Sequence, residues 1–113
     1  MERKKINVYT KLNNIEESYE IIAIKNDNAI KYIDLCNNIM IIDMSQDIIK
    51  RENNDYKFII DFIKNEIDIY IKKYQKNVKK SIKTLLLKKN KKSYLVRYLL
   101  EDENTINEYY VKF

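Results

Sequence analysis

Apolar and polar residues alternate in short runs along almost the whole chain, and asparagine-rich breaks separate these runs. In the runs Ile6–Thr10, Tyr56–Phe62 and Tyr94–Leu100, every second residue is apolar or favours a strand, so these residues share one face. Because successive side chains of a β-strand point to opposite faces, this period of two predicts strands that are buried on one side. The pattern therefore predicts an all-β protein made of antiparallel strands.

The breaks divide the chain into about ten expected strands. Their expected ranges are Lys5–Leu12, Ser18–Lys25, Ala29–Leu35, Ile39–Met44, Ile48–Arg51, Tyr56–Ile63, Ile67–Tyr74, Val78–Leu87, Tyr94–Leu100 and Ile106–Phe113. Turn signals at intervals of about 8–12 residues are typical of a meander, a sandwich or a barrel. No break is long enough to be an interdomain linker, so residues 1–113 are expected to form a single domain.

One long segment also fits a helix. Its apolar residues recur at helical spacing at Ile59, Ile63, Ile67, Ile71, Tyr74, Val78, Ile82 and Leu86. Lysine favours a helix here, whereas isoleucine, tyrosine and phenylalanine favour a strand. A helix from about Ile59 to Leu87 is therefore the alternative to strands that break near Asn65 and Gln75–Asn77.

The chain contains no histidine, no glycine and one cysteine, Cys36. Without histidine there is no histidine metal ligand, general base or triad, and a single thiol cannot form a cysteine-cluster metal site. Without glycine, the glycine-rich phosphate loop and the dinucleotide fingerprint are excluded. We therefore expect no enzyme activity, no metal and no cofactor. Asparagine is expected to replace glycine in the turns, because it tolerates left-handed backbone best among the remaining residues.

The cysteine count also bears on location, because one thiol cannot form an intramolecular disulfide and thus fits a reducing cytoplasm. Without histidine to activate it, Cys36 is expected to be a small buried residue. No apolar run approaches the roughly 20 residues of a membrane helix. Residues 1–5 lead directly into a strand pattern rather than into a signal core. We expect a cytoplasmic protein that has no membrane partner.

Several segments together resemble a known family. They are Ile49–Arg51, Tyr56–Phe62, Lys83-Thr84 and Tyr94–Leu100. An arginine that ends one strand, a phenylalanine-bearing strand, a threonine late in a long strand and a tyrosine-leucine strand near the end are similar to the YwiB-like family, a bacterial domain of unknown function. Family members usually carry glycines where this chain has Asn53 or Asn54 and Asn77. The resemblance implies a single antiparallel, lipocalin/calycin-like β-barrel of about 8–10 strands and implies little about activity.

Four residues are candidates for a ligand site inside such a barrel. Arg51 and Arg97 are two of only three arginines, and both lie in strands among apolar residues. Either one could hold an anionic ligand bidentately, or could instead form a structural ion pair or face solvent. Thr84 and Tyr98 fit the resembled pattern and could supply polar groups to a pocket, or could be ordinary strand residues. The leading hypothesis is a non-enzymatic module that binds a small ligand, by analogy with calycins.

Lysine supplies the second hypothesis. Residues 1–68 hold ten basic and 13 acidic residues, whereas residues 69–113 hold 12 basic and four acidic ones, within a net charge of +5. A positive face on two adjacent strands would attract nucleic acid or another polyanion. The candidate residues are Lys72, Lys73, Lys76, Lys79, Lys80 and Lys83. The plainer interpretation is a solvated face whose lysines discourage edge-to-edge pairing of strands.

A third hypothesis is a protein-interaction or structural module that binds no ligand. The sequence does not specify an oligomeric state. For the core, we expect the alternating residues Phe58, Ile60, Phe62, Ile82, Val96 and Tyr98 to pack together.

Overall fold

The computed structural model describes residues 2–113, and all ten expected strands are present in it. They are β1 (Glu2–Leu12), β2 (Ile15–Asn26), β3 (Ala29–Ile33), β4 (Ile39–Asp43), β5 (Ile48–Glu52), β6 (Tyr56–Asp61), β7 (Glu66–Ile71), β8 (Lys76–Lys89), β9 (Ser93–Leu100) and β10 (Thr105–Lys112). The alternative helix from Ile59 to Leu87 is wrong, because this segment forms the end of β6, all of β7 and most of β8. No helix within residues 2–113 could cross a membrane.

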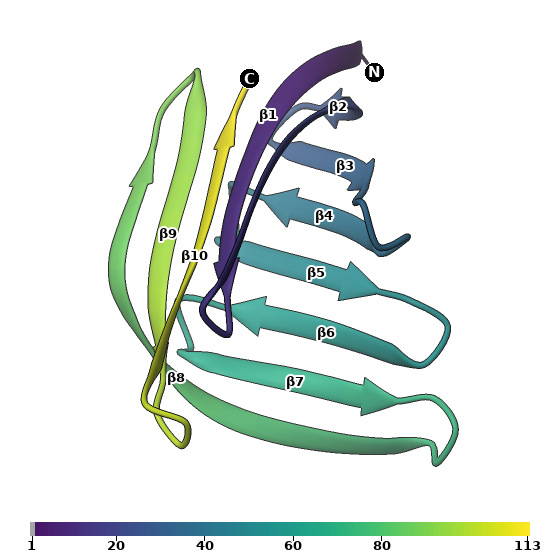
Figure 1. The fold of residues 1–113 in the computed structure, drawn as a ribbon, viewed down its shortest axis with the longest axis vertical. Coiled ribbons are helices and arrows are strands. Elements are labelled where there is room, and N and C mark those ends of the chain that lie inside the picture. The colour runs from purple at the N-terminus through teal and green to yellow at the C-terminus, as the bar shows by residue number, and fades with distance from the viewer. Residues whose placement is uncertain (1) are drawn as a thin grey trace.

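The strands form a closed antiparallel barrel in which each strand pairs with the next one in the sequence and β10 returns to pair with β1. This confirms the predicted all-β, calycin-like barrel. The short strands β3 to β7 form one ladder, while β9, β10 and the longer β1 run across them (Figure 1). The long strand β8 joins the two parts, because Lys76–Ser81 pair with β7 and Ile82–Lys89 pair with β9.

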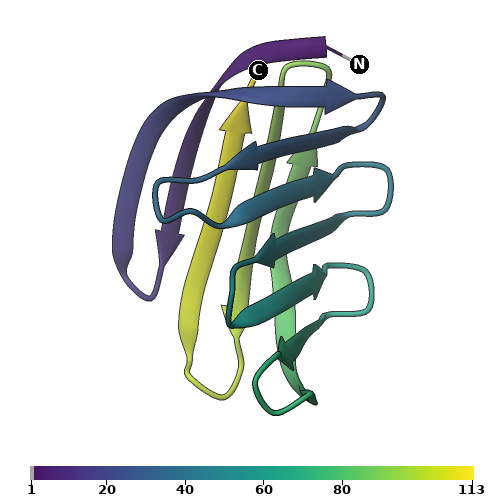
Figure 2. The same ribbon diagram turned by 90° about the vertical axis from the view of Figure 1, so that its right-hand side faces the viewer.

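Two features interrupt the regular ladders. A register shift between Thr84 and Leu86 marks a bulge in β8, which is the usual device for bending a strand. In β2, residues 15–25 all pair with β1, but only Ile24–Asn26 pair with β3. Residues 15–23 therefore run past the β3–β4 hairpin without a ladder between them, and Figure 2 shows β2 curving away from β3. We call this gap the β2 seam.

Inward-facing side chains form one hydrophobic core that draws on all ten strands. The predicted core residues Ile60, Phe62, Ile82, Val96 and Tyr98 are buried in it. Phe58 is only partly buried and packs against the edge of this cluster. Five of the six predicted core residues are thus confirmed as buried, and Phe58 marks the border between the core and an opening.

Asparagine performs the turn work that glycine would otherwise do, as predicted. Eight described residues have a left-handed backbone, and five of them are asparagine: Asn13, Asn14, Asp27, Asn37, Asp47, Asn65, Gln75 and Asn104. Asn53 and Asn90 close turns differently, because each side-chain oxygen accepts hydrogen bonds from backbone N–H groups two and three residues ahead.

The hairpin turns alternate between two ends of the barrel. The turns after β2, β4, β6 and β8 lie at one end, which we call the closed end because Asp47 and Tyr94 are buried there. The turns after β1, β3, β5, β7 and β9 lie at the opposite end. We call this the open end, because the interior is hollow there.

Candidate functional site

A row of inward-facing residues crosses the short-stranded ladder near the open end. Registered neighbours place them on the same face in the order Tyr32, Met40, Arg51, Phe58 and Ile69, from β3 to β7. Residues directly opposite each other on paired strands project to one side of the sheet. Arg51, at the centre, is therefore a charged side chain in an otherwise uncharged interior row.

The environment of Arg51 supplies packing but no counterion. Its guanidinium carbon lies 4.4 Å from the centroid of the Phe58 ring, in a cation–π arrangement. Its Nε atom is buried and has no hydrogen-bond partner among residues 2–113. No described carboxylate lies within ion-pair distance of Arg51. Arg51 as a whole is half-buried, but a buried polar atom without a partner is costly, so this group is suited to an anion that the chain itself does not provide.

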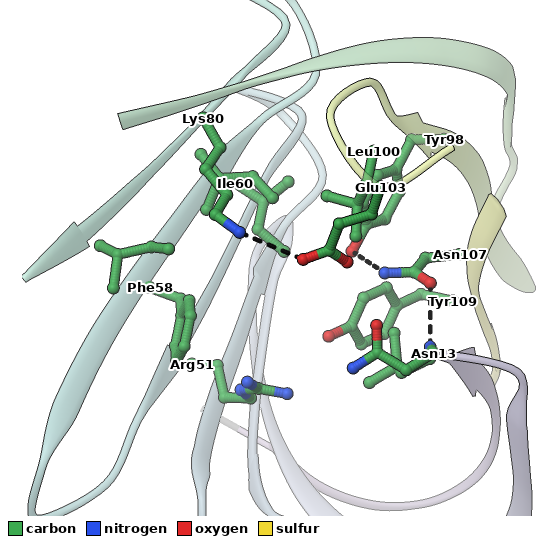
Figure 3. Close-up of a pocket in the computed structure, with 13 residues that line it drawn as sticks. Asn13, Arg51, Phe58, Ile60, Lys80, Tyr98, Leu100, Glu103, Asn107 and Tyr109 are labelled. Carbon is green, nitrogen blue, oxygen red and sulfur yellow. Dashed lines mark hydrogen bonds and ion pairs between the residues drawn. The ribbon is translucent and has the colours of Figure 1, made fainter. Parts of the chain in front are cut away.

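Arg51 borders a cavity of about 200 Å³ at the open end. Figure 3 shows its side chain extended into the space between Phe58 and Tyr109. Apolar side chains line much of the wall, namely Leu12, Phe58, Ile60, Ile67, Ile69 and Leu100. With roughly 30 Å³ for each liquid water, the space holds about seven groups of water size.

Polar groups from β9 and β10 face Arg51 across this cavity. The Asn107 side-chain nitrogen donates to the Tyr98 hydroxyl over 3.5 Å, and the backbone N–H of Asn13 donates to the Asn107 side-chain oxygen over 3.1 Å. Burial raises the pKa of both Tyr98 and Tyr109, although the positive charge of Arg51 acts against this rise. Both hydroxyls therefore stay protonated near neutral pH and can donate hydrogen bonds.

An ion pair stands at the rim of the cavity. Lys80 of β8 places its Nζ 3.2 Å from Glu103 Oε1 and 3.8 Å from Asp102 Oδ2, in the β9–β10 turn. The dashed contact between Lys80 and Glu103 is visible above the cavity in Figure 3. Because these rim charges are paired with each other, Arg51 supplies the unpaired positive charge inside the cavity.

Of the four predicted ligand residues, Arg51 and Tyr98 line the cavity together, and the other two do not. The Thr84 hydroxyl lies 2.8 Å from the Asn65 side-chain oxygen and 3.1 Å from the Phe62 carbonyl oxygen, and its single proton can be donated to either acceptor. Thr84 thus fastens β8 to the β6–β7 turn and lies away from the cavity.

Arg97 lies on the outer surface, and its side chain is 46% exposed. Its Nη2 is 2.7 Å from Glu108 Oε1, and its Nε donates to the same oxygen over 2.8 Å. It points outward because its neighbours Val96 and Tyr98 point inward. The structure therefore corrects the idea that Arg97 enters the barrel, and the structural ion pair is the interpretation that applies.

The six candidate lysines do not form one uniform positive face. Lys79 is exposed on the outer side, whereas Lys80 is half-buried at the cavity rim. Lys79 pairs in register with Asp68, and its Nζ lies 3.9 Å from Glu66 Oε1. Two acidic residues of β7 are therefore next to this lysine. Lys72 lies 2.7 Å from Glu52 and donates to the Asn53 carbonyl oxygen. Exposed candidate lysines without an ion-pair partner among residues 2–113 are Lys73, Lys76 and Lys83.

Cys36 is exposed, so its expected burial is wrong. It lies in the β3–β4 turn, where its backbone N–H donates to the Asp34 side chain over 2.9 Å.

Sequence reasoning missed Tyr109 and Asn107 as cavity residues. Their spacing could have identified both, because Asn107 and Tyr109 lie four and two residues before the buried Val111 and so share its face of β10. Within residues 2–113, no group of three acidic or cysteine side chains is arranged to hold a metal ion.

No protein-family model, curated protein or solved structure matches this chain. The resemblance to the YwiB-like family therefore stays a prediction. Functional inference rests on the geometry of the open end.

Proposed function

We propose that this protein is a binding module without catalytic activity, and that the open end of its barrel binds a small molecule with an anionic group and an apolar part. The supporting observation is Arg51, whose buried Nε lacks a partner beside a cavity of about 200 Å³. A carboxylate or phosphate oxygen at this position would complete a charge-assisted hydrogen bond, which is among the stronger contacts in proteins.

The remaining walls suit the rest of such a ligand. Leu12, Ile67, Ile69 and Leu100 provide apolar surface, while Tyr98 presents a neutral hydroxyl. Small-molecule sites commonly combine mostly apolar walls with a few polar groups that fix orientation. The raised pKa values of Tyr98 and Tyr109 favour hydrogen bonding over proton transfer, because an efficient acid or base has a pKa near the working pH.

A comparison of two arginines tests the proposal. Thermal-shift screening with small carboxylates and phosphates, followed by calorimetry, should identify an anion that stabilises the native protein. Arg51→Gln should weaken its binding about tenfold to 100-fold, because hydrogen bonds to charged groups contribute about 1.5–3 kcal/mol. Arg97→Gln is the matched control, since it removes an arginine that is paired with Glu108 on the outer surface.

Two outcomes would contradict the proposal. One is the absence of any stabilising anion in the screen. The other is an equal loss of affinity in Arg51→Gln and Arg97→Gln, which would show that the anion responds only to overall charge.

A further inference from the structure

A second, smaller cavity of about 80 Å³ adjoins Arg51 on the side away from Phe58. It shares Leu12, Arg51 and Tyr109 with the larger cavity, so these residues stand at the junction of the two. Residues from β2 and from the β3–β4 hairpin complete its wall, among them Glu17, Tyr19, Tyr32, Asp34 and Asn38. The cavity thus lies under the β2 seam, where the missing ladder leaves room between strands.

The small cavity contains a second buried polar atom without a partner. Tyr32 is 3% exposed, and its hydroxyl forms no well-aligned hydrogen bond within residues 2–113; its polar neighbour is the Tyr19 side chain, which lines the same cavity and influences its pKa. Arg51 Nε is the other such atom, and both residues line this cavity. One registered neighbour, Met40, separates them in the interior row, which places their backbones about 10 Å apart at ordinary strand spacing. Buried polar groups are normally satisfied, so two unsatisfied ones at one cavity indicate a missing partner.

The charges around the small cavity differ from those around the large one. Glu17 and Asp34 contribute carboxylates, and no lysine lines this cavity. The Asp34 oxygens are held in place by hydrogen bonds from the turn, including one of 2.9 Å from the Asn38 side chain. A ligand that extends past Arg51 into the small cavity therefore passes from a positive to a negative environment.

We propose that the small cavity is a subsite for a protonated amino group, so that the ligand is an apolar α-amino acid or a close analogue. Its carboxylate lies on Arg51, its apolar side chain fills the larger cavity, and its ammonium group points to Tyr32 and Glu17. This assignment rests on the proposed function, because it uses the same arginine as the anion site. The limited volume agrees with it, since about 80 Å³ holds two or three groups of water size.

Burial raises the pKa of Tyr32, so its hydroxyl is neutral and can accept a hydrogen bond from an ammonium group. The same hydroxyl would also hydrogen-bond a water molecule, and the test must separate these two cases. If an ammonium group is the partner, the amino group of the ligand adds to the binding affinity. If a water molecule is the partner, it does not.

The test uses probes that share one apolar group and differ in their charges. Calorimetry should compare L-phenylalanine with hydrocinnamate, which lacks the amino group, and with phenethylamine, which lacks the carboxylate. L-Leucine, isocaproate and isoamylamine form a second, smaller series. We expect the amino acid to bind more tightly than the acid, by about threefold to tenfold for one added hydrogen-bonded group, and the amine to bind most weakly.

Tyr32→Phe and Glu17→Gln should remove this preference for the amino acid and leave the affinity for the matching acid unchanged. Glu20→Gln is the control, because Glu20 lies on the outer face of β2, 3.5 Å from Lys5. Glu17 is exposed, so Glu17→Gln keeps the test valid even if Tyr32→Phe lowers stability.

The outcomes separate the two proposals. If an acid binds as tightly as its amino acid, or if Tyr32→Phe and Glu17→Gln weaken both equally, the ammonium subsite is wrong while the anion site stands. If neither acid nor amino acid binds in either series, the ammonium subsite is wrong. A negative anion screen in addition would show that the proposed function is wrong as well.

Discussion

Lys89 and Asp47 meet at the closed end of the barrel, where the Lys89 Nζ lies 3.1 Å from Oδ1 and 3.2 Å from Oδ2 of Asp47. The same Nζ donates to the Met44 carbonyl oxygen over 2.9 Å, and the buried Tyr94 hydroxyl donates to Asp47 Oδ1 over 3.3 Å. These contacts satisfy the polar groups at this end, in contrast to Arg51 and Tyr32 near the other end.

Asp47 should be the most sensitive turn residue in the barrel, because it also has a left-handed backbone with φ of 55°. Asp47→Ala should lower the free energy of unfolding by about 2–4 kcal/mol, since it leaves the Tyr94 hydroxyl without a partner and strains the backbone. Asp47→Gly removes the same contacts without the strain and should cost less. Urea denaturation of both variants checks this order, and an equal loss would exclude a backbone contribution.

Two phenylalanines should respond differently to truncation. Phe62 is 3% exposed and packs against Tyr98 with ring centroids 5.4 Å apart, so Phe62→Ala should cost about 3–5 kcal/mol. Phe58 is only partly buried, and Phe58→Ala should cost less, on the order of 1–2 kcal/mol. It should also weaken anion binding by removing the ring that supports Arg51. Denaturant melts measure both variants, and equal losses would contradict the border position of Phe58.

Stability should fall in alkaline solution. Burial raises the pKa of Tyr19 from 10.0 to about 12, and burial together with nearby Asp47 raises the pKa of Tyr94. The unfolded chain releases these protons near pH 10, whereas the folded chain retains them. The stabilisation is therefore complete below about pH 10 and is lost as the pH rises towards the folded pKa values.

Unfolding titrations between about pH 9 and pH 12 measure this loss. Tyr94→Phe removes one titrating group, so its stability should decline less steeply with pH, by up to about 1.4 kcal/mol per pH unit. A slope identical to that of the native protein would show that Tyr94 ionises as freely in the folded chain as in the unfolded one.

Lysine-dependent binding of nucleic acid should be weak. Lys79 lies beside acidic residues of β7, and Lys72 and Lys80 form ion pairs with carboxylates of the chain. We expect fluorescence anisotropy with single-stranded DNA to show little binding at about 0.15 M salt, because non-specific affinity for nucleic acid falls steeply as the salt concentration rises. Reversing the charge of Lys73, Lys76 and Lys83 to glutamate should leave binding in the cavity unchanged. Tight binding that this triple variant abolishes would instead support a polyanion-binding module.

The sequence predicted the barrel well because its information is local. Alternation of apolar and polar residues sets each strand, and asparagine at left-handed turn positions sets the hairpins between them. The direction of Arg97 was harder to predict, because the apolar residues Leu95 and Leu99 lie on the same side of the strand as Arg97. Alternation alone therefore did not show which face of β9 is buried.

The cavity itself depends on long-range register. Tyr32 on β3 and Tyr109 on β10 are far apart in sequence and meet only because the barrel closes. The bulge in β8 adds a second difficulty, since it shifts the alternation between Thr84 and Leu86. Lys83 consequently faces outward while Lys89, an even number of residues later, reaches the buried Asp47. Neither effect is visible in the local pattern.

The winding of the barrel has a consequence for how the chain reaches this state. Within residues 2–113, nine of the ten ladders join consecutive strands, and only β1–β10 joins distant ones. Hairpins can thus form one after another at low loop-closure cost, and we expect the five residue pairs from Asn7↔Lys112 to Lys11↔Glu108 to complete the ring last. Until then, a curved sheet presents two unpaired edges that can recruit other copies of the chain. We therefore expect this short ladder to lower the tendency of the chain to aggregate, because it removes both edges at once.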